Sequence, residues 1–212
     1  MFGVKLKWLA AVGAAVGLAV LVLWLVSAPA GQTVSATPFL ALSQVPVPEM
    51  PAKAAELVQA APPLERETAA AAVLRAVATM ARTGVMPFVV SAICRRNPEV
   101  TGTVVATAIQ LQPEDVLYIC RAALCAAPDR VEQIVATACA ARPDSFANVA
   151  LVAFDRCPTA SQLILYGMTN TIPGLKPYWD KAAQPGGTND FVALINQTVK
   201  LVNEAAKAEN RK

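Results

Sequence analysis

The chain has 212 residues, of which 55% are hydrophobic and 16% are charged, and its formal net charge is +3. This composition excludes a disordered polyampholyte, and the small, scattered positive charge argues against nucleic-acid binding. Because histidine is absent, the commonest general base and the commonest metal ligand are missing, so we expect no enzyme, cofactor or metal site; a non-histidine enzyme is the alternative.

The first predicted element is an apolar helix over residues 8–26. Its nineteen uncharged residues would extend about 28 Å, which is close to the hydrocarbon thickness of a bilayer. Trp8 and Trp24 stand near its two ends, where indole rings favour the membrane interfaces. We interpret residues 1–30 as a single transmembrane anchor, and a signal sequence cleaved near Ala30, followed by secretion, is the alternative.

Positive charges set the expected topology of this span. Lys5 and Lys7 precede the apolar run, and the next positive charge is Lys53. By the positive-inside rule the N-terminus is cytoplasmic and the rest of the chain is exported, to the periplasm or another extracytoplasmic space. Gly13 and Gly17 form a GxxxG pair within the span, which marks either a helix-dimer face, and hence a homo-oligomer, or only the small residues common in an apolar run rich in alanine and glycine.

Residues 31–51 are rich in proline, serine and threonine. This composition predicts an extended linker between the membrane and a soluble domain. We expect that domain, a helical-repeat domain, to cover residues 52–173. It opens with a short helix over residues 52–61 and a longer one over residues 64–82, with acidic side chains in its first turn. These two helices are expected to cap the repeats.

The centre of the chain repeats every fifteen residues. Proline recurs six times at this interval, at Pro98, Pro113, Pro128, Pro143, Pro158 and Pro173. Counted from the residue after each proline, positions 6, 7, 10 and 11 are apolar except at Thr169, and this is the stripe of an amphipathic helix. Each proline ends a unit, because it lacks an N–H and its ring clashes with the preceding turn. Helices this short are unstable alone, so we expect an α-solenoid of antiparallel hairpins.

The charged residues of the repeat are expected to serve the helix ends. Asp129 with Glu132, and Thr159 with Gln162, have the spacing of capping boxes just after a proline. Arg142 is one of several arginines near the opposite end of a unit, where a cation complements the negative end of the helix dipole. These charges are therefore interpreted as structural.

In this arrangement residues 64–173 resemble the helical-hairpin repeat proteins, the broad group that contains the tetratricopeptide and HEAT arrays. The resemblance is architectural, because the fifteen-residue unit is shorter than the helices of those families and the tetratricopeptide Trp, Gly and Tyr positions are missing. It implies a surface for protein partners. We therefore expect a scaffold or accessory subunit that binds another protein of the cell envelope.

The five cysteines all lie inside the repeat, at Cys94, Cys120, Cys125, Cys139 and Cys157. Their spacing contains no CxxC pair and there is no histidine, so no metal site is predicted. Most of them fall in the apolar stripe and are expected to pack as small hydrophobic residues. A disulfide between Cys94 and Cys125, or between Cys125 and Cys157, is the alternative, because each pair lies on next-but-one helices of an exported domain.

The fifteen-residue pattern breaks after Pro173. The prolines and glycines of residues 174–188 predict an irregular segment, in which Tyr178 and Trp179 are candidate partner contacts or a cover for the last hairpin. Residues 189–212 predict an amphipathic helix and a soluble tail, and the apolar face of this helix is expected to dock on the solenoid or on another chain. The expected fold class is all-α: a transmembrane helix, a small α-solenoid and a C-terminal helix.

Overall fold

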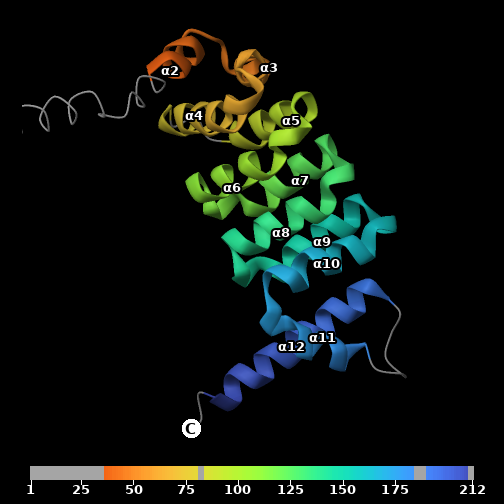
Figure 1. The fold of residues 1–212 in the computed structure, drawn as a ribbon. Helices are drawn as coiled ribbons and strands as arrows, with labels where there is room; N and C mark the ends of the chain where they lie inside the picture. Colours follow the sequence, from red (N-terminus) through yellow and green to blue (C-terminus); the bar gives the residue numbers. More distant parts are fainter. Residues whose placement is uncertain (1–35, 81–83, 184–189, 210–212) are drawn as a thin grey trace, which may run out of the picture. The chain divides into compact units, whose positions relative to one another are not determined.

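The computed structural model describes residues 36–80, 84–183 and 190–209, and these ranges are almost entirely helical and contain no strand. The described residues from Thr37 onward form one compact unit. Its helices (Figure 1) are α2 (Ala36–Ser43), α3 (Met50–Ala60), α4 (Arg66–Thr79), α5 (Met86–Arg96), α6 (Thr101–Leu111), α7 (Val116–Ala126), α8 (Val131–Ala141), α9 (Phe146–Arg156), α10 (Ser161–Thr171), α11 (Lys176–Ala182) and α12 (Phe191–Glu209). The predicted all-helical class is confirmed for these residues.

Each complete repeat consists of an eleven-residue helix, one linking residue and a three-residue 3-10 turn that begins at the repeating proline. In the link from α6 to α7, the N–H of Gln112 donates to the carbonyl of Ala108 at 2.9 Å, and the carbonyl of Gln112 accepts from the N–H of Asp115 at 3.1 Å. Gln112 has φ −138° and ψ 73°, because the ring of the following proline disfavours the α conformation there. One linking residue thus closes one helix and opens the next turn.

The α-helices begin three residues after the proline, and the predicted capping boxes do not form. The N-caps of α8 and α10 make no side-chain hydrogen bond, so the pairs Asp129 with Glu132 and Thr159 with Gln162 are wrong predictions. The Asp129 carboxylate instead lies 3.5 Å from Nε of Arg130. Backbone hydrogen bonds of the 3-10 turn precede α8 and α10. They take the place of the side-chain caps that the sequence predicts at the helix start.

The repeat helices stack in two rows. Helices α3, α5, α7 and α9 form one row, and α4, α6, α8 and α10 form the other. Every helix packs on the next helix of its own row and also on its neighbours in sequence, so successive hairpins lie on top of one another (Figure 1). This is the arrangement of a helical solenoid, which confirms the predicted repeat architecture.

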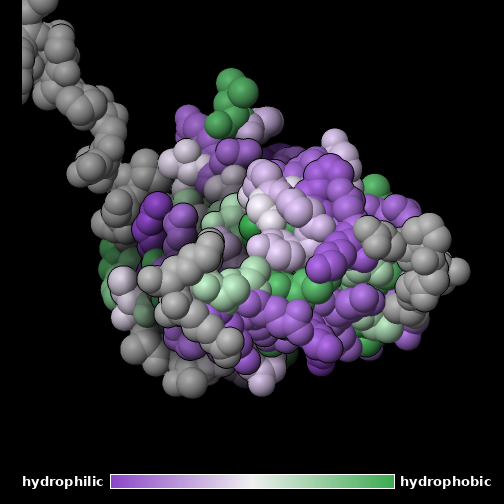
Figure 2. Space-filling model, turned by 90° about the horizontal axis from the view of Figure 1, so that it is seen from below, coloured by the Kyte–Doolittle hydropathy of each residue, from purple (hydrophilic) through white to green (hydrophobic). Residues whose placement is uncertain are grey.

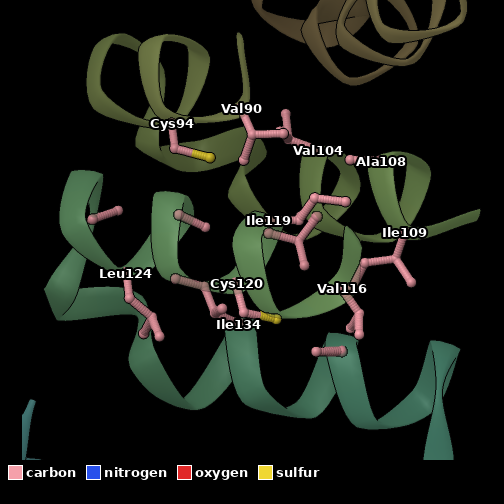
Figure 3. Packing of buried hydrophobic residues seen from close by; sticks show 14 of the residues in the cluster. Val90, Cys94, Val104, Ala108, Ile109, Val116, Ile119, Cys120, Leu124 and Ile134 are labelled. Atoms are coloured by element: carbon pink, nitrogen blue, oxygen red, sulfur yellow. The ribbon is translucent and has the colours of Figure 1, made fainter. Parts of the chain in front are cut away.

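The core of the stack lies between the two rows. Positions 6, 7, 10 and 11 of the repeat units are buried, with three half-buried exceptions at Phe154, Leu165 and Thr169. Val90, Val104 and Ile119, from three consecutive helices, gather in this interior (Figure 3). The predicted stripe of apolar residues is therefore the core, and it is built largely from valine, isoleucine, alanine and cysteine.

The N-terminal part of the stack begins earlier than the sequence predicts. Helix α2 lies within the predicted linker, residues 31–51, and Leu42 and Met50 are fully buried. An extended linker is therefore wrong for residues 36–51, where prolines stand in the first turns of short helical elements instead of breaking them.

The predicted membrane anchor, residues 1–30 with Trp8 and Trp24, lies outside the described residues. Within the ranges that the structure does describe, no helix combines the length and the apolar character needed to cross a bilayer. The anchor and the topology derived from it stay predictions.

Helices α11 and α12 close the C-terminal end. Helix α11 forms inside residues 174–188, so an irregular segment is the wrong prediction for its first half, whereas α12 confirms the predicted final helix. The ring of Phe191 in α12 stacks on Phe154 in α9, with centroids 4.6 Å apart. Seen from below, this end presents mostly hydrophilic residues with a few hydrophobic ones between them (Figure 2), as a capping element requires.

Candidate protein-binding surface

Two exposed aromatic side chains mark one surface of the solenoid. Phe88 in α5 is 68% exposed and Tyr118 in α7 is 66% exposed. Both occupy position 5 of their units, so they lie at the same place on successive helices of one row. Large apolar side chains that stay in solvent next to each other are typical of an interaction surface.

Two hollows adjoin Phe88. The first, of about 610 Å³, lies between the N-terminal helices and α5, and its lining includes Val47, Pro51 and Arg95. The second, of about 450 Å³, lies between α5 and α7, and its lining includes Tyr118. Phe88 lines both. We call the two hollows, with Phe88 and Tyr118, the Phe88 groove.

The charged residues of the groove are mainly arginines. Arg95 lines the first hollow, is exposed, and forms no ion pair with any carboxylate of the described residues. Arg121 and Asp115 line the second hollow. Arg121 lies 4.0 Å from Asp155 in α9, and both side chains are at least half exposed, so this pair is weak. The first hollow therefore joins a largely apolar wall to a cation that has no carboxylate partner in the described part of the chain.

The predicted partner contacts Tyr178 and Trp179 lie on α11 and are half-buried. Trp179 packs against the hydrophobic core. Together with Leu165 it lines a separate hollow of about 420 Å³, beside an ion pair of Lys176 with Asp180 at 3.0 Å. Neither aromatic residue lines the Phe88 groove. Trp179 covers the last repeat, and a role in partner binding stays a prediction.

Of the five cysteines, Cys125 is exposed and the other four are buried. Burial raises the pKa of Cys94 to about 11 and those of Cys120 and Cys139 to about 12, which disfavours their reactive thiolates. Burial and, second, the nearby Cys125 raise the pKa of Cys157. Both predicted disulfides, Cys94 with Cys125 and Cys125 with Cys157, stay predictions.

Metal ligands do not gather anywhere in the described ranges. No group of three or more Cys, Asp or Glu side chains there has the arrangement to hold a metal ion. The acidic residues lie mostly at the starts of the repeat units and in their turns, for example Glu114 and Asp144. The Arg142 guanidinium holds the pKa of the Asp144 carboxyl below its usual range, and the pair forms two hydrogen bonds of 3.0 and 2.7 Å. Carboxylates such as that of Asp144 therefore stabilise the turns between the helices.

Sequence reasoning missed the Phe88 groove. It followed the buried positions of the repeat and gave no weight to position 5, which is solvent-facing. The signal was present: position 5 carries two aromatic residues, Phe88 and Tyr118, in one row, whereas the other row carries Thr103, Gln133 and Leu163 there. Aromatic residues at position 5 of two successive helices of one row indicate a surface that runs along that row.

Comparisons with known proteins add no family to this description. No protein-family model matches the chain, and no curated protein or solved structure matches it. The chemistry of the exposed surface is therefore the ground for a functional assignment.

Proposed function

We propose that the chain is a membrane-tethered scaffold or accessory subunit that binds another protein of the cell envelope through the Phe88 groove. The observation that carries this proposal is the exposure of Phe88 and Tyr118 on adjacent helices of one row, beside two largely apolar hollows. Aromatic and arginine side chains are enriched among the residues that dominate protein interfaces. The groove supplies both kinds.

The helical stack supports such a role because it presents these residues without rearrangement. Phe88 projects from a helix whose opposite face holds Val89, Val90 and Ile93 in the core, all fully buried. The backbone of α5 is therefore held in place by packing, and a rigid surface loses little conformational entropy when a partner binds.

The membrane tether is supported by the sequence of residues 1–30. Its uncharged run is long enough to span a bilayer, with Trp8 and Trp24 near the ends and two lysines before it. In this proposal the N-terminus is cytoplasmic and the solenoid is exported. A secreted form that begins at Gly31 is the alternative. Carbonate extraction followed by N-terminal sequencing of the membrane and soluble fractions distinguishes the two forms. A soluble chain that starts at Gly31 would contradict the tether.

Site-specific photo-crosslinking tests the binding surface. A photoreactive amino acid at Tyr118 is expected to yield a covalent adduct with a partner in native membranes. The matched control is Gln133, which is also exposed and also occupies position 5, but in the other row. Equal adducts at both positions, or none at Tyr118, would contradict the assignment of the surface.

A further inference from the structure

We propose that the Phe88 groove recognises an extended peptide segment of the partner in which an aspartate or glutamate accompanies apolar side chains, with Arg95 receiving the carboxylate. This inference rests on the proposed function above and specifies the chemistry of the partner. It follows from the composition of the first hollow, from the continuity of the two hollows, and from the finding that no described carboxylate pairs with Arg95.

The first hollow offers a binding site for an apolar side chain. Its walls include Val47, Pro48 and Pro51 on one side and Phe88 and Ala92 of α5 on the other. At about 610 Å³ it falls within the usual range of ligand pockets. An aliphatic or aromatic side chain placed there would cover Phe88, whose exposed area is otherwise in contact with water.

Arg95 supplies the charge at this binding site. Its guanidinium has five donors and matches the two oxygens of a carboxylate. Arg142 of the stack already uses this geometry, since its Nε and Nη2 donate to the two carboxylate oxygens of Asp144 at 3.0 and 2.7 Å. Arg95 has no such partner among the described residues. Its guanidinium is therefore available to pair with a carboxylate of the occupant.

The continuity of the groove favours an extended segment. Phe88 and Ser91 line both hollows, so one occupant reaches the first hollow and Tyr118 by crossing α5. Packed helices lie about 8–10 Å apart. An extended chain in the polyproline II conformation advances about 3.1 Å per residue with three residues per turn, so side chains three residues apart lie on one side of it, about 9 Å from each other. Two apolar side chains with this spacing would reach the two hollows, with the acidic residue next to the one that enters the first.

Panning of displayed random peptides of about twelve residues, long enough to cover both hollows, against the full-length chain in detergent tests this inference. The expected result is enrichment of peptides with an acidic residue beside an aliphatic or aromatic one. Synthetic copies of these peptides should bind Arg95→Glu about ten-fold more weakly than the original chain, because the attraction becomes a repulsion.

Arg96→Glu is the matched control. Arg95 and Arg96 are both exposed in the last turn of α5, so the two substitutions change the net charge and the helix end in the same way. Only Arg95 lines the hollow, and Arg96→Glu should change the affinity less than about two-fold. Circular dichroism of both variants verifies that the stack remains folded.

Three outcomes would overturn the inference. The first is enrichment of peptides without acidic residues, and the second is equal loss of affinity in the two variants. The third is a crosslink from Tyr118 to residues 1–35 of the same chain or to a second copy, which would identify another occupant. If Tyr118 still captures a partner and Arg95→Glu leaves that capture unchanged, the proposed function stands and the carboxylate inference fails.

Discussion

Substitution of Gly167 by alanine tests whether a close helix contact sets the geometry of the stack. Gly167 is buried in α10, and a Cβ at this position would lie 2.7 Å from the carbonyl oxygen of Glu132 and 3.4 Å from the nitrogen of Ala136, both in α8. The obstacle is backbone, which cannot turn aside as a side chain can. Helix α10 must therefore move away from α8 and loosen the packing of Ile164 and Met168, which are fully buried.

Two opposing effects decide the size of the change. Overpacking of a core typically costs about 1–3 kcal/mol, whereas alanine in place of glycine within a helix gains about 0.5–1 kcal/mol. The difference of these two ranges is about 0–2.5 kcal/mol, and because the obstacle is backbone we expect a net loss of about 1–2 kcal/mol of unfolding free energy for Gly167→Ala. For a domain of this size that corresponds to a Tm lower by about 2–8 °C.

Gly102→Ala is the control for helix propensity. A Cβ at Gly102 in α6 would lie 2.6 Å from Nε2 of Gln133, which is the end of a flexible, exposed side chain. Gln133 can rotate away, so the propensity gain remains and stability should rise by up to about 1 kcal/mol. Thermal and urea unfolding followed by circular dichroism measure both variants. A Gly167→Ala protein as stable as the original, or an equal loss in Gly102→Ala, would refute the close-contact reasoning.

Three further predictions concern the thiols and the C-terminal cap. Iodoacetamide at neutral pH should label Cys125 first, because it is the exposed thiol, and peptide mass spectrometry should find Cys120 unlabelled until the chain unfolds. Burial raises the pKa of Cys120 to about 12, which is above the pKa of a thiol in the unfolded chain. The stabilisation from the buried, protonated thiol is therefore complete below about pH 8.5. As the pH rises from there toward 12, the free energy of unfolding falls by about 1.4 kcal/mol per pH unit. Urea midpoints in reducing buffer should therefore fall between pH 8 and pH 10, and less steeply in Cys120→Ala; equal slopes would contradict this. Phe191→Ala removes a ring that is 8% exposed and stacked on Phe154, and should cost about 3 kcal/mol. Limited proteolysis should then cut within α12 first, and unchanged cleavage would show that the ring does not hold this helix.

The repeat was predictable from the sequence because the spacing of its prolines and the pattern of its core positions indicate the same fifteen-residue helical unit. Each proline ends a helix for steric reasons that hold in any context, and positions 6, 7, 10 and 11 can be buried only if each unit is one helix. The start of each α-helix was less predictable. Proline is compatible with the first turn of an α-helix and with a 3-10 turn alike, and the choice depends on the backbone of the residue before it, such as Gln112.

Helix α2 and the Phe88 groove depend on contacts between distant residues, and local sequence does not encode such contacts. The segment of α2 is mostly apolar and contains Pro38, but at eight residues it is too short to show a helical period by itself. Burial of Leu42 in the core accounts for the helix. In the groove, Val47 and Arg95 line one hollow although they lie far apart in the chain.

The repeat separates the residues that hold the fold from those available for recognition. Positions that face the core are fixed by neighbouring helices, and the contact of α10 with α8 at Gly167 shows how little space remains between them. Position 5 of the row that contains α5 and α7 faces solvent, and the residue there varies from Phe88 to Tyr118 to Asn148 along the row. Because this side chain contributes little to the core, its identity can follow the partner while the stack stays the same. Specificity is therefore expected to reside in the exposed positions of α5 and α7, and the core positions to govern stability.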